Sequence, residues 1–219
     1  PPPPPPLFSS RRRHTRLLTQ SRGLGDVYKR QGGRCITAFA RDLGIIQRQT
    51  SFEGLDGIHE ASVLPNGEIR LKLIDVEGIE RLKDGYLLNT GSPHFVSFVN
   101  ALEQMDVERE GRQIRHESRF GREGVNVNFV ERMQAANTIR VRTFERGVEG
   151  ETWSCGTGVT AAAISACFDS GTDNLAYKVH TRGGNLEVSF KNRKEGSYSD
   201  IYLTGPASHV YDGTVEIAV

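Results

Sequence analysis

The segment WSCGTGVTAAAISACF, residues 153–168, is the part of the sequence that most restricts the fold. From Gly156 onwards it contains no charged residue, and the small side chains of Ala161–Ala163 occupy its middle. A helix that is apolar on every side has to be buried on every side. We therefore expect a thin helix, running to about Phe168, that lies deep inside a sheet or barrel.

Strand patterns occur on both sides of this helix in the sequence. Residues 57–76 alternate apolar and polar side chains around a Pro-Asn-Gly turn, which predicts a β-hairpin. The other expected strands lie in 85–99, 124–133, 137–148 and on both sides of the turn at 182–184. Helical spacing of apolar residues predicts further helices at 32–46 and 106–120. The fold class that follows is α+β, or mixed α/β.

Composition and charge exclude several classes of function. Of the 219 residues, 37% are hydrophobic and 25% charged, which is typical of a globular protein. No segment is long and apolar enough to span a bilayer, so we expect no membrane protein. Residues 1–31 carry a net charge of +6, so residues 32–219 carry −5 of the chain's total of +1. An acidic body of this kind argues against nucleic-acid binding.

The three cysteines are too few, and odd in number, for a disulfide framework. Free thiols favour a reducing, cytoplasmic location. We expect Cys35 and Cys167 to be small buried core residues, whereas Cys155 has an unusual setting. The sequence contains neither a GxGxxG motif nor a P-loop, so nothing indicates a nucleotide.

Residues 1–31 differ in character from the rest. They begin with six prolines, are rich in arginine and show neither helical nor strand periodicity. A transit peptide and a proline-led basic arm for an acidic partner are two interpretations. We favour a third, a non-native stretch such as translated adapter sequence joined to a truncated gene. The expectation is a disordered basic tail up to Gly32.

Cys155 stands directly before the predicted buried helix. A helix N-terminus has unpaired N–H groups and partial positive charge, and both lower the pKa of a thiol placed there. The following Gly-Thr-Gly can present backbone amides as a cradle for an anion such as a carboxylate. A small buried cysteine in a tight turn is the alternative, and both interpretations stay open at this point.

Several polar residues in the expected strands are further candidates. His94 directly follows the Gly-Ser-Pro turn of the 85–99 segment, where Pro93 holds it rigidly, and Glu145 and Arg146 stand together at a strand end. Asn126 and Asn128 alternate with valines and so project from one face of a strand. Each also has an ordinary explanation: a structural histidine, a surface ion pair, or solvated amides.

Four segments, in this order, resemble diaminopimelate epimerases: NTGSPHFV, EGVNVNFVE, IRVRTFERGVEGETWSCGTG and LTGPASHVYDG. The resemblance covers essentially all of residues 32–219. SCGTG alone is shared with proline-racemase-like relatives, whereas RTFERG before the cysteine loop and the closing TGPASHVYDG favour the epimerase.

This resemblance implies a cofactor-independent interconversion of LL- and meso-2,6-diaminopimelate in lysine biosynthesis, with no metal ion. It implies two pseudo-symmetric halves, each a sheet wrapped round a central helix, with the site between them. Family members use two cysteines on opposite faces of the substrate α-carbon, one removing a proton and the other donating one. A small-molecule amino-acid substrate, a homodimer and a cytoplasmic location are also implied.

Carried onto this chain, the resemblance makes Cys155 one of the two acid/base thiols. The substrate-binding residues that it implies are Asn126, Glu145, Arg146, Gly156 and Thr157. The amides of the last two would bind the carboxylate, and Glu145 with Arg146 would hold the distal end or the amino group. His94 and Glu145 would tune the pKa values of the thiols. Ser92 stands where many members have asparagine, for which we expect a modest effect.

The other cysteine of the pair is missing. GGRC at 32–35 matches the end of the family motif Cys-Gly-Asn-Gly-Gly-Arg-Cys, which puts Lys29 at the position of the first catalytic cysteine. Lysine, with a reference pKa of about 10.4, is a poor substitute base unless it is desolvated. We therefore expect that this chain cannot epimerise efficiently.

The same comparison predicts an incomplete first half. We expect residues 32–73 plus 207–219 to be a remnant of an N-terminal domain, with exposed apolar surface, and 74–206 to form the C-terminal domain. Two other functions stay open: a related racemase acting on proline or hydroxyproline, and a non-catalytic binding protein of the same fold.

Overall fold

The computed structural model describes residues 25–54, 57–172, 175–193, 196–210 and 214, with the backbone alone for 25–31. The predicted tail therefore lies outside the described residues up to residue 24. Most of residues 207–219, predicted to belong to the N-terminal remnant, lies outside them too, and residues 207–210 are not in a strand.

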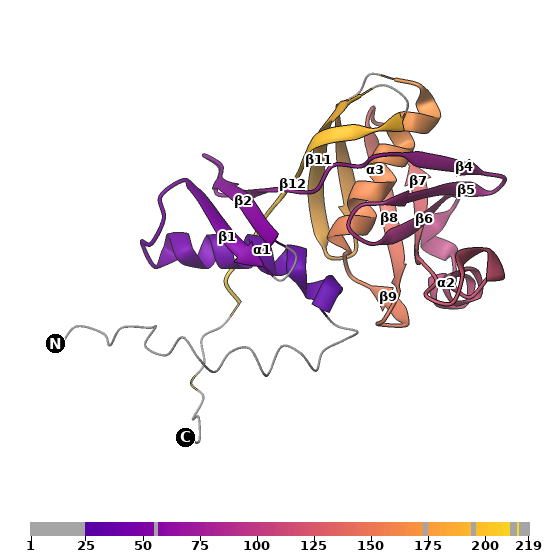
Figure 1. The fold of residues 1–219 in the computed structure, drawn as a ribbon, viewed down its shortest axis with the longest axis horizontal. Helices are drawn as coiled ribbons and strands as arrows, with labels where there is room; N and C mark the ends of the chain where they lie inside the picture. Colours follow the sequence, from indigo (N-terminus) through magenta and orange to yellow (C-terminus); the bar gives the residue numbers. More distant parts are fainter. Residues whose placement is uncertain (1–24, 55–56, 173–174, 194–195, 211–213, 215–219) are drawn as a thin grey trace.

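The predicted buried helix is α3, Gly156–Ser170. Cys155 is its N-cap residue, and Gly171 ends it in a left-handed conformation with a φ of 58°. Every residue from Thr157 to Cys167 is buried. Figure 1 shows α3 (orange) in the middle of the strands, and it packs against strands from both sides of it in the sequence. This confirms the expectation drawn from the uncharged, small-residue segment.

The described strands form one twelve-stranded sheet. Their order across the sheet is β1-β2-β3-β12-β11-β10-β8-β7-β6-β5-β4, and β9 pairs with β8 off this path. In chain order the strands are β1 Gln49–Gly54, β2 Gly57–Val63, β3 Ile69–Lys72, β4 Ile79–Leu82, β5 Gly85–Asn89, β6 Pro93–Phe98, β7 Asn126–Arg132, β8 Thr138–Glu145, β9 Gly150–Thr152, β10 Ala176–Thr181, β11 Gly184–Asn192 and β12 Tyr198–Gly205. The mixed α/β class is confirmed, as are the hairpin of β2 and β3 and the strands predicted around α3.

Alternate residues of the central strands serve two different cores. Val130 on β7 contributes to the main core around α3, whereas Val127 and Phe129 contribute to a second core with Phe144. Helix α2, Val107–Arg115, packs against β7, β8 and β9. The helix predicted over 106–120 is divided in two, because a short 3-10 helix at Ser118–Phe120 follows α2. Among the described residues, no helix is long and apolar enough to cross a membrane.

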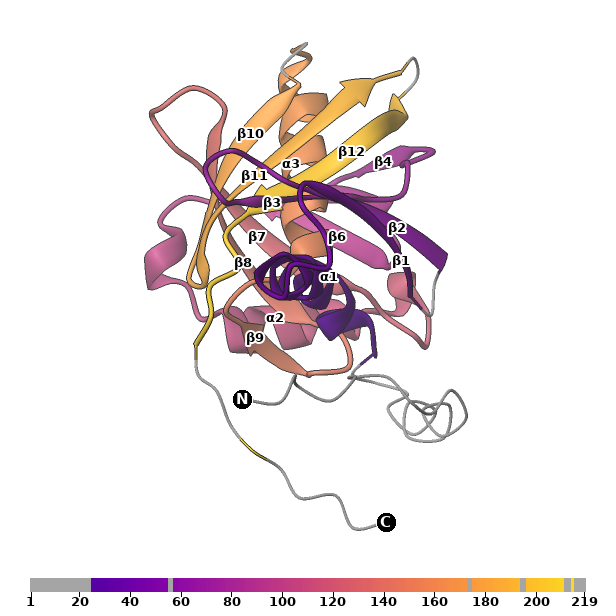
Figure 2. The same ribbon diagram turned by 90° about the vertical axis from the view of Figure 1, so that its left-hand side faces the viewer.

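The two halves repeat one arrangement. Helix α1, Gly25–Asp42, is followed by the antiparallel strands β1, β2 and β3, as α3 is followed by β10, β11 and β12. The third strands of the two repeats pair antiparallel, with Leu71 opposite Leu203. Figure 2 views the molecule from the side of α1 and its strands. This is the predicted pseudo-symmetry, with a smaller first half, because only α3 is also enclosed by β5–β8. The division at residues 73/74 stays a prediction.

Helix α1 differs from its prediction in two ways. It begins at Gly25 rather than near Gly32, because residues 25–31 extend the same helix, and extending an existing helix is easier than starting one. Its exposed side carries Cys35, which was predicted to be buried. The apolar residues that share a helical face with it are 44–58% exposed: Ile36, Phe39 and Leu43. Spacing identifies a common face, but it does not say which face the strands cover.

Because this face of α1 is apolar and open, we expect the chain to bind the dye ANS there. Phe39→Ser should reduce ANS fluorescence while changing the free energy of unfolding by no more than about 0.5 kcal/mol, since the side chain is largely exposed. Fluorescence titration and thermal unfolding provide the two measurements. Unchanged ANS binding in Phe39→Ser, with Val210→Ser as a control at another exposed apolar site, would contradict this assignment of the surface.

Candidate active site

The predicted site residues meet at one end of the sheet, where β6 and β7 begin, β8 ends and α3 begins. Strands β6 and β7 are parallel, with His94 opposite Asn126. The backbone N–H of Arg146, just after β8, donates to Oδ1 of Asn126 over 3.0 Å. The fold therefore brings together residues that are separated by more than fifty positions in the sequence.

Cys155 is 7% exposed at the start of α3. Its carbonyl accepts the first helical hydrogen bond, from Val159 N, at 2.8 Å. Its Sγ lies 3.3 Å from Oγ1 of Thr157 and also receives the backbone N–H of Gly158. Thr90 donates to the Thr157 carbonyl over 3.1 Å and so ties the first turn of the helix to the loop between β5 and β6. The thiol is held in one place at the helix end.

Gly158 allows the helix to approach strand β7 closely. A Cβ at this position would lie 2.2 Å from Oδ1 of Asn128 and 3.1 Å from Oγ1 of Thr143. Real Cβ atoms do not approach neighbours so closely, so the glycine is required by space rather than by an unusual backbone angle. Close packing against β7 therefore explains the second glycine of the Gly-Thr-Gly segment, in addition to the backbone amides that this segment presents.

Glu145 lies directly beside the thiol. Its carboxylate is 1% exposed and accepts hydrogen bonds from the Thr152 hydroxyl and from the Cys155 thiol. Burial raises the pKa of Glu145, and these two hydrogen bonds oppose that rise. A thiol that donates to a carboxylate keeps its own proton in the resting site.

The pKa of Cys155 moves opposite to the direction predicted from the sequence. Burial, followed by the negative charge of Glu145, raises it to about 12. The Thr157 hydroxyl and the Gly158 N–H lower it, as expected at a helix N-terminus, but they are outweighed. The physical reason is that burial removes the water that would solvate a thiolate and Glu145 adds a nearby negative charge, and the partial charges of the helix end do not compensate for both.

His94 is completely buried and its ring orientation is fixed. The Asn128 amide donates to Nδ1 over 3.0 Å and to the Phe95 carbonyl, while its Oδ1 accepts from Thr143. Nδ1 is therefore an acceptor, so Nε2 carries the hydrogen and donates to Ser92 Oγ at 3.0 Å. The Asn128 amide thus selects the tautomer. A role for His94 in tuning a thiol stays a prediction.

Asn126 and Arg146 differ in how they are held. The Asn126 amide donates to Ser92 Oγ (3.3 Å) and the Pro93 carbonyl (3.0 Å), in addition to accepting from Arg146 N. This side chain joins the ends of three strands. The Arg146 guanidinium is 22% exposed and lies 3.9 Å from Glu123, which is itself 92% exposed. Substrate binding by either residue stays a prediction, and of the two side chains Arg146 is the one that reaches solvent.

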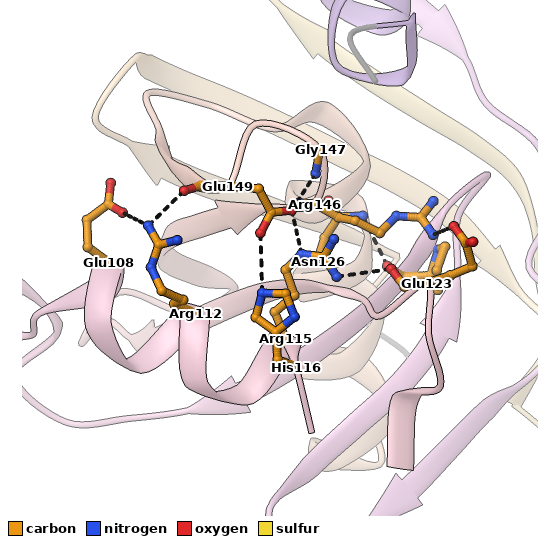
Figure 3. Close-up of polar contacts among 10 residues, drawn as sticks. Glu108, Arg112, Arg115, His116, Glu123, Asn126, Arg146, Gly147 and Glu149 are labelled. Atoms are coloured by element: carbon orange, nitrogen blue, oxygen red, sulfur yellow. Dashed lines mark hydrogen bonds and ion pairs between the residues drawn. The ribbon is translucent and has the colours of Figure 1, made fainter. Parts of the chain in front are cut away.

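An ion-pair cluster fixes the turn that follows β8 (Figure 3). Glu149 accepts from Arg115 Nε at 2.6 Å and from Gly147 N at 3.0 Å, and its own carbonyl accepts from Arg112. Arg115 also donates to the Glu123 carbonyl over 3.0 Å. This cluster connects α2 to the backbone that carries Arg146. Sequence reasoning missed it because the partners come together only in the folded chain.

A second set of contacts fixes the loop before Cys155. Arg142, 6% exposed, donates twice to Glu151 at 2.7 Å, and Arg182 donates to the same carboxylate at 2.9 Å. Gly183 N donates to the Trp153 carbonyl at 2.7 Å. The turn between β10 and β11 therefore supports the segment that delivers the thiol.

The remaining cysteine behaves as predicted. Cys167 is 1% exposed and donates to the Thr172 carbonyl over 3.2 Å.

Within the described ranges, no group of three or more His, Cys, Asp or Glu side chains is placed to hold a metal ion.

Comparison with known sequences gives consistent matches. Residues 86–210 match the family model for diaminopimelate epimerase. The diaminopimelate epimerase of Flavobacterium psychrophilum is 43% identical, over 84% of this chain and 71% of its own length. That of Chlorobaculum tepidum is 37% identical, over 85% of this chain and 74% of its own length.

Comparison with solved structures supports the fold alone, because the identities are low. A phenazine biosynthesis protein (PhzF family) of Bacillus anthracis has a TM-score of 0.63 at 13% identity, covering 80% of this chain and 71% of its own. A hydroxyproline epimerase of Agrobacterium vitis has a TM-score of 0.56 at 16% identity, covering 79% of this chain and 62% of its own.

Glu145→Gln should accelerate alkylation of Cys155 by iodoacetamide. At about pH 8, a pKa near 12 leaves about one Cys155 thiol in ten thousand ionised. Removing the adjacent charge lowers that pKa, and each unit gives about a tenfold faster reaction below it. Mass spectrometry of the Cys155 peptide, with exposed Cys35 as internal reference, measures the rate against pH. An equal or slower rate than in the control Glu123→Gln would show that Glu145 does not suppress the thiolate.

Gly158→Ala should destabilise the chain by about 1–3 kcal/mol, because the added Cβ collides with Asn128 and forces the helix away from β7. Gly32→Ala on α1 is the matched control, since a Cβ there meets nothing within 4 Å and favours the helix by up to about 1 kcal/mol. Chemical denaturation measures both. Equal stability of the two variants would refute the close approach.

Proposed function

Because the chain belongs to the diaminopimelate epimerase family, we propose that the site around Cys155 is one acid–base half of an interconversion of LL- and meso-2,6-diaminopimelate. The reaction needs no cofactor in this proposal, and it belongs to lysine biosynthesis. The observation that carries the proposal is the buried thiol at the N-cap of α3, hydrogen-bonded to the carboxylate of Glu145.

The thiol–carboxylate pair can move a proton in either direction. With a pKa near 12, Cys155 rests as a thiol and is ready to protonate a carbanion at the substrate α-carbon. When the thiol acts as a base, Glu145 is placed to accept its proton, because burial has already raised the pKa of that carboxyl. The two groups therefore share one proton, and the substrate decides which of them holds it.

The amides at the start of α3 stabilise the charge that the reaction creates. Removing the α-proton transfers negative charge onto the substrate carboxylate. The backbone N–H groups of Gly156 and Thr157 lie at the positive end of a buried helix, where such charge is stabilised without reorganisation. The hydroxyl of Thr90 holds this turn in place through the Thr157 carbonyl.

The other roles follow the positions of the side chains. Arg146, partly exposed beside the thiol loop, binds the distal end of the substrate, and Glu145 attracts the amino group. Asn126 orients the substrate and also holds the ends of the strands in place through Ser92. His94, hydrogen-bonded to Ser92, adjusts the pKa values of the thiols. In this proposal the intact enzyme is a homodimer.

The opposing half of the reaction is not provided by this chain. Lys29 occupies the position of the family's first catalytic cysteine, and the helical backbone already begins at Gly25. In a helix that starts there, the N–H groups just after residue 29 bond to preceding carbonyls instead of pointing at a ligand. Both the base and the anion cradle are therefore absent from α1, and the chain removes and returns a proton on one face only. A binding protein without turnover is the alternative that this feature favours.

We therefore expect the chain to exchange the α-proton of diaminopimelate for deuterium in D2O without changing its configuration. Proton NMR follows the loss of the α-proton, and chiral chromatography measures LL and meso isomers. Cys155→Ser should abolish the exchange. Lys29→Cys should still give no epimer above background, because position 29 lies inside a helix.

Two results decide between the alternatives. If calorimetry detects binding of diaminopimelate but no deuterium exchange occurs, the chain is a binding protein rather than half of a catalytic site. If the chain exchanges the α-proton of proline or hydroxyproline but not that of diaminopimelate, the proposed substrate is wrong. Robust formation of the other isomer by the unmodified chain would overturn the assignment of Lys29.

A further inference from the structure

The buried carboxylate of Glu145 receives a hydrogen bond from a second side chain besides the thiol of Cys155. The hydroxyl of Thr152 donates to its Oε1, and in the described part of the chain no cation pairs with it. Because the carboxylate is 1% exposed, water cannot replace a donor that is lost. A single hydroxyl therefore has a large influence on whether this group carries its charge.

The pairing of β8 with β9 places this hydroxyl beside the carboxylate. Thr152 is the partner of Thr143, and Gly150 is the partner of Glu145. Thr152 and Glu145 therefore lie on the same face of the sheet as diagonal neighbours. The contact follows from the register of the two strands.

The preceding residue holds β9, and with it Thr152, in position. Glu151 accepts two hydrogen bonds from Arg142 at 2.7 Å and one from Arg182 at 2.9 Å. Its backbone N–H donates to a carboxylate oxygen of Glu108, on α2, over 2.8 Å. These contacts join β9 to β8, to α2 and to the turn between β10 and β11. The hydroxyl of Thr152 is thus presented from a firmly anchored strand.

Other charged or titratable groups around Glu145 are engaged with different partners. Arg146, the next residue, lies 3.9 Å from Glu123. The ring of His94, on β6, is neutral because its Nδ1 accepts from Asn128. The charge of the carboxylate is therefore balanced by hydrogen bonds rather than by a counter-ion.

We propose that Thr152 is a positioning residue that keeps the proton shared by Cys155 and Glu145 on the sulfur. When the proton moves from Sγ to the carboxylate, a thiol and a carboxylate become a thiolate and a carboxylic acid. A hydroxyl donates more strongly to an ionised carboxylate than to a neutral carboxyl group, so Thr152 stabilises the first form. The use of this proton rests on the proposed function, but its position can be measured without a substrate.

Thr152→Val removes the hydroxyl and keeps the shape of the side chain. At low pH both proteins hold Glu145 protonated, and at about pH 10 both hold it ionised, so iodoacetamide should alkylate Cys155 at equal rates at these limits. In between, the thiolate forms by transfer of the proton to Glu145, and the variant should react up to about tenfold faster. Mass spectrometry of the Cys155 peptide measures the rate against pH, with Cys35 as internal reference.

Three further variants control this experiment. Thr152→Ser keeps a hydroxyl and should restore the unmodified profile. Thr138→Val removes a buried hydroxyl from the far end of β8, where it donates to the Ala136 carbonyl, and should leave the profile unchanged. In the Glu145→Gln background, Thr152→Val should have no further effect, because no carboxylate is left to receive the proton.

A rate gain confined to intermediate pH, and absent in the Glu145→Gln background, supports the proposal. An equal gain at every pH would show that the substitution merely opens the site, and this result or the lack of any gain overturns the proposal. If Thr152→Val does not fold, the infrared C=O band of protonated Glu145, assigned by its loss in Glu145→Gln, decides in Thr152→Ala. A higher midpoint pH for this band than in the unmodified chain supports the proposal, and an equal or lower one overturns it.

These results are separate from the fate of the proposed function. If the chain does not exchange the α-proton of diaminopimelate for deuterium, the proposed function fails. The alkylation profile still shows which group holds the proton, because it is measured without substrate.

Discussion

The structure depends on the complete burial of residues 157–167 of helix α3. Because the side chains of these residues are uncharged and mostly small, strands that precede and follow the helix in the sequence can pack around it at once. The ends of β6, β7 and β8 then converge on its first turn, where the polar residues gather. The same burial removes water from the thiol of Cys155 and the carboxylate of Glu145, so these two groups interact strongly. The fold and the chemistry of the site thus have one origin.

Local patterns predicted most of the elements. The uncharged segment predicted α3, the Pro-Asn-Gly turn predicted the hairpin of β2 and β3, and alternation predicted β7 and β8. Quantities that depend on neighbours distant in sequence were not accessible. Periodicity placed Ile36 and Phe39 on one face of α1, but only the packing shows that β2 and β3 cover the other face. The direction of the Cys155 pKa shift required the burial of the thiol and the position of Glu145, ten residues earlier and on another element.

Three buried charges illustrate how differently the chain handles desolvation. Arg142 is neutralised by Glu151 and by carbonyl acceptors, and it fixes the loop before the thiol. Glu145 is left without a cation and instead accepts hydrogen bonds from a thiol and a hydroxyl, which keeps it ready to exchange a proton. Arg34 has no counter-charge among the described residues, and its Nε has no hydrogen-bond partner there. The first arrangement gives rigidity, and the second leaves a proton that can move between two groups.

The most direct test of this account is the protonation state of Cys155 at neutral pH. An infrared difference spectrum between the unmodified chain and Cys155→Ser isolates the S–H stretch of this thiol from those of Cys35 and Cys167. The account predicts a clear S–H band at neutral pH, shifted to lower frequency by the hydrogen bond to Glu145 and moved back in Glu145→Gln. An absent band would mean that the site holds a thiolate at rest, and it would contradict the central claim that burial and Glu145 keep the proton on sulfur.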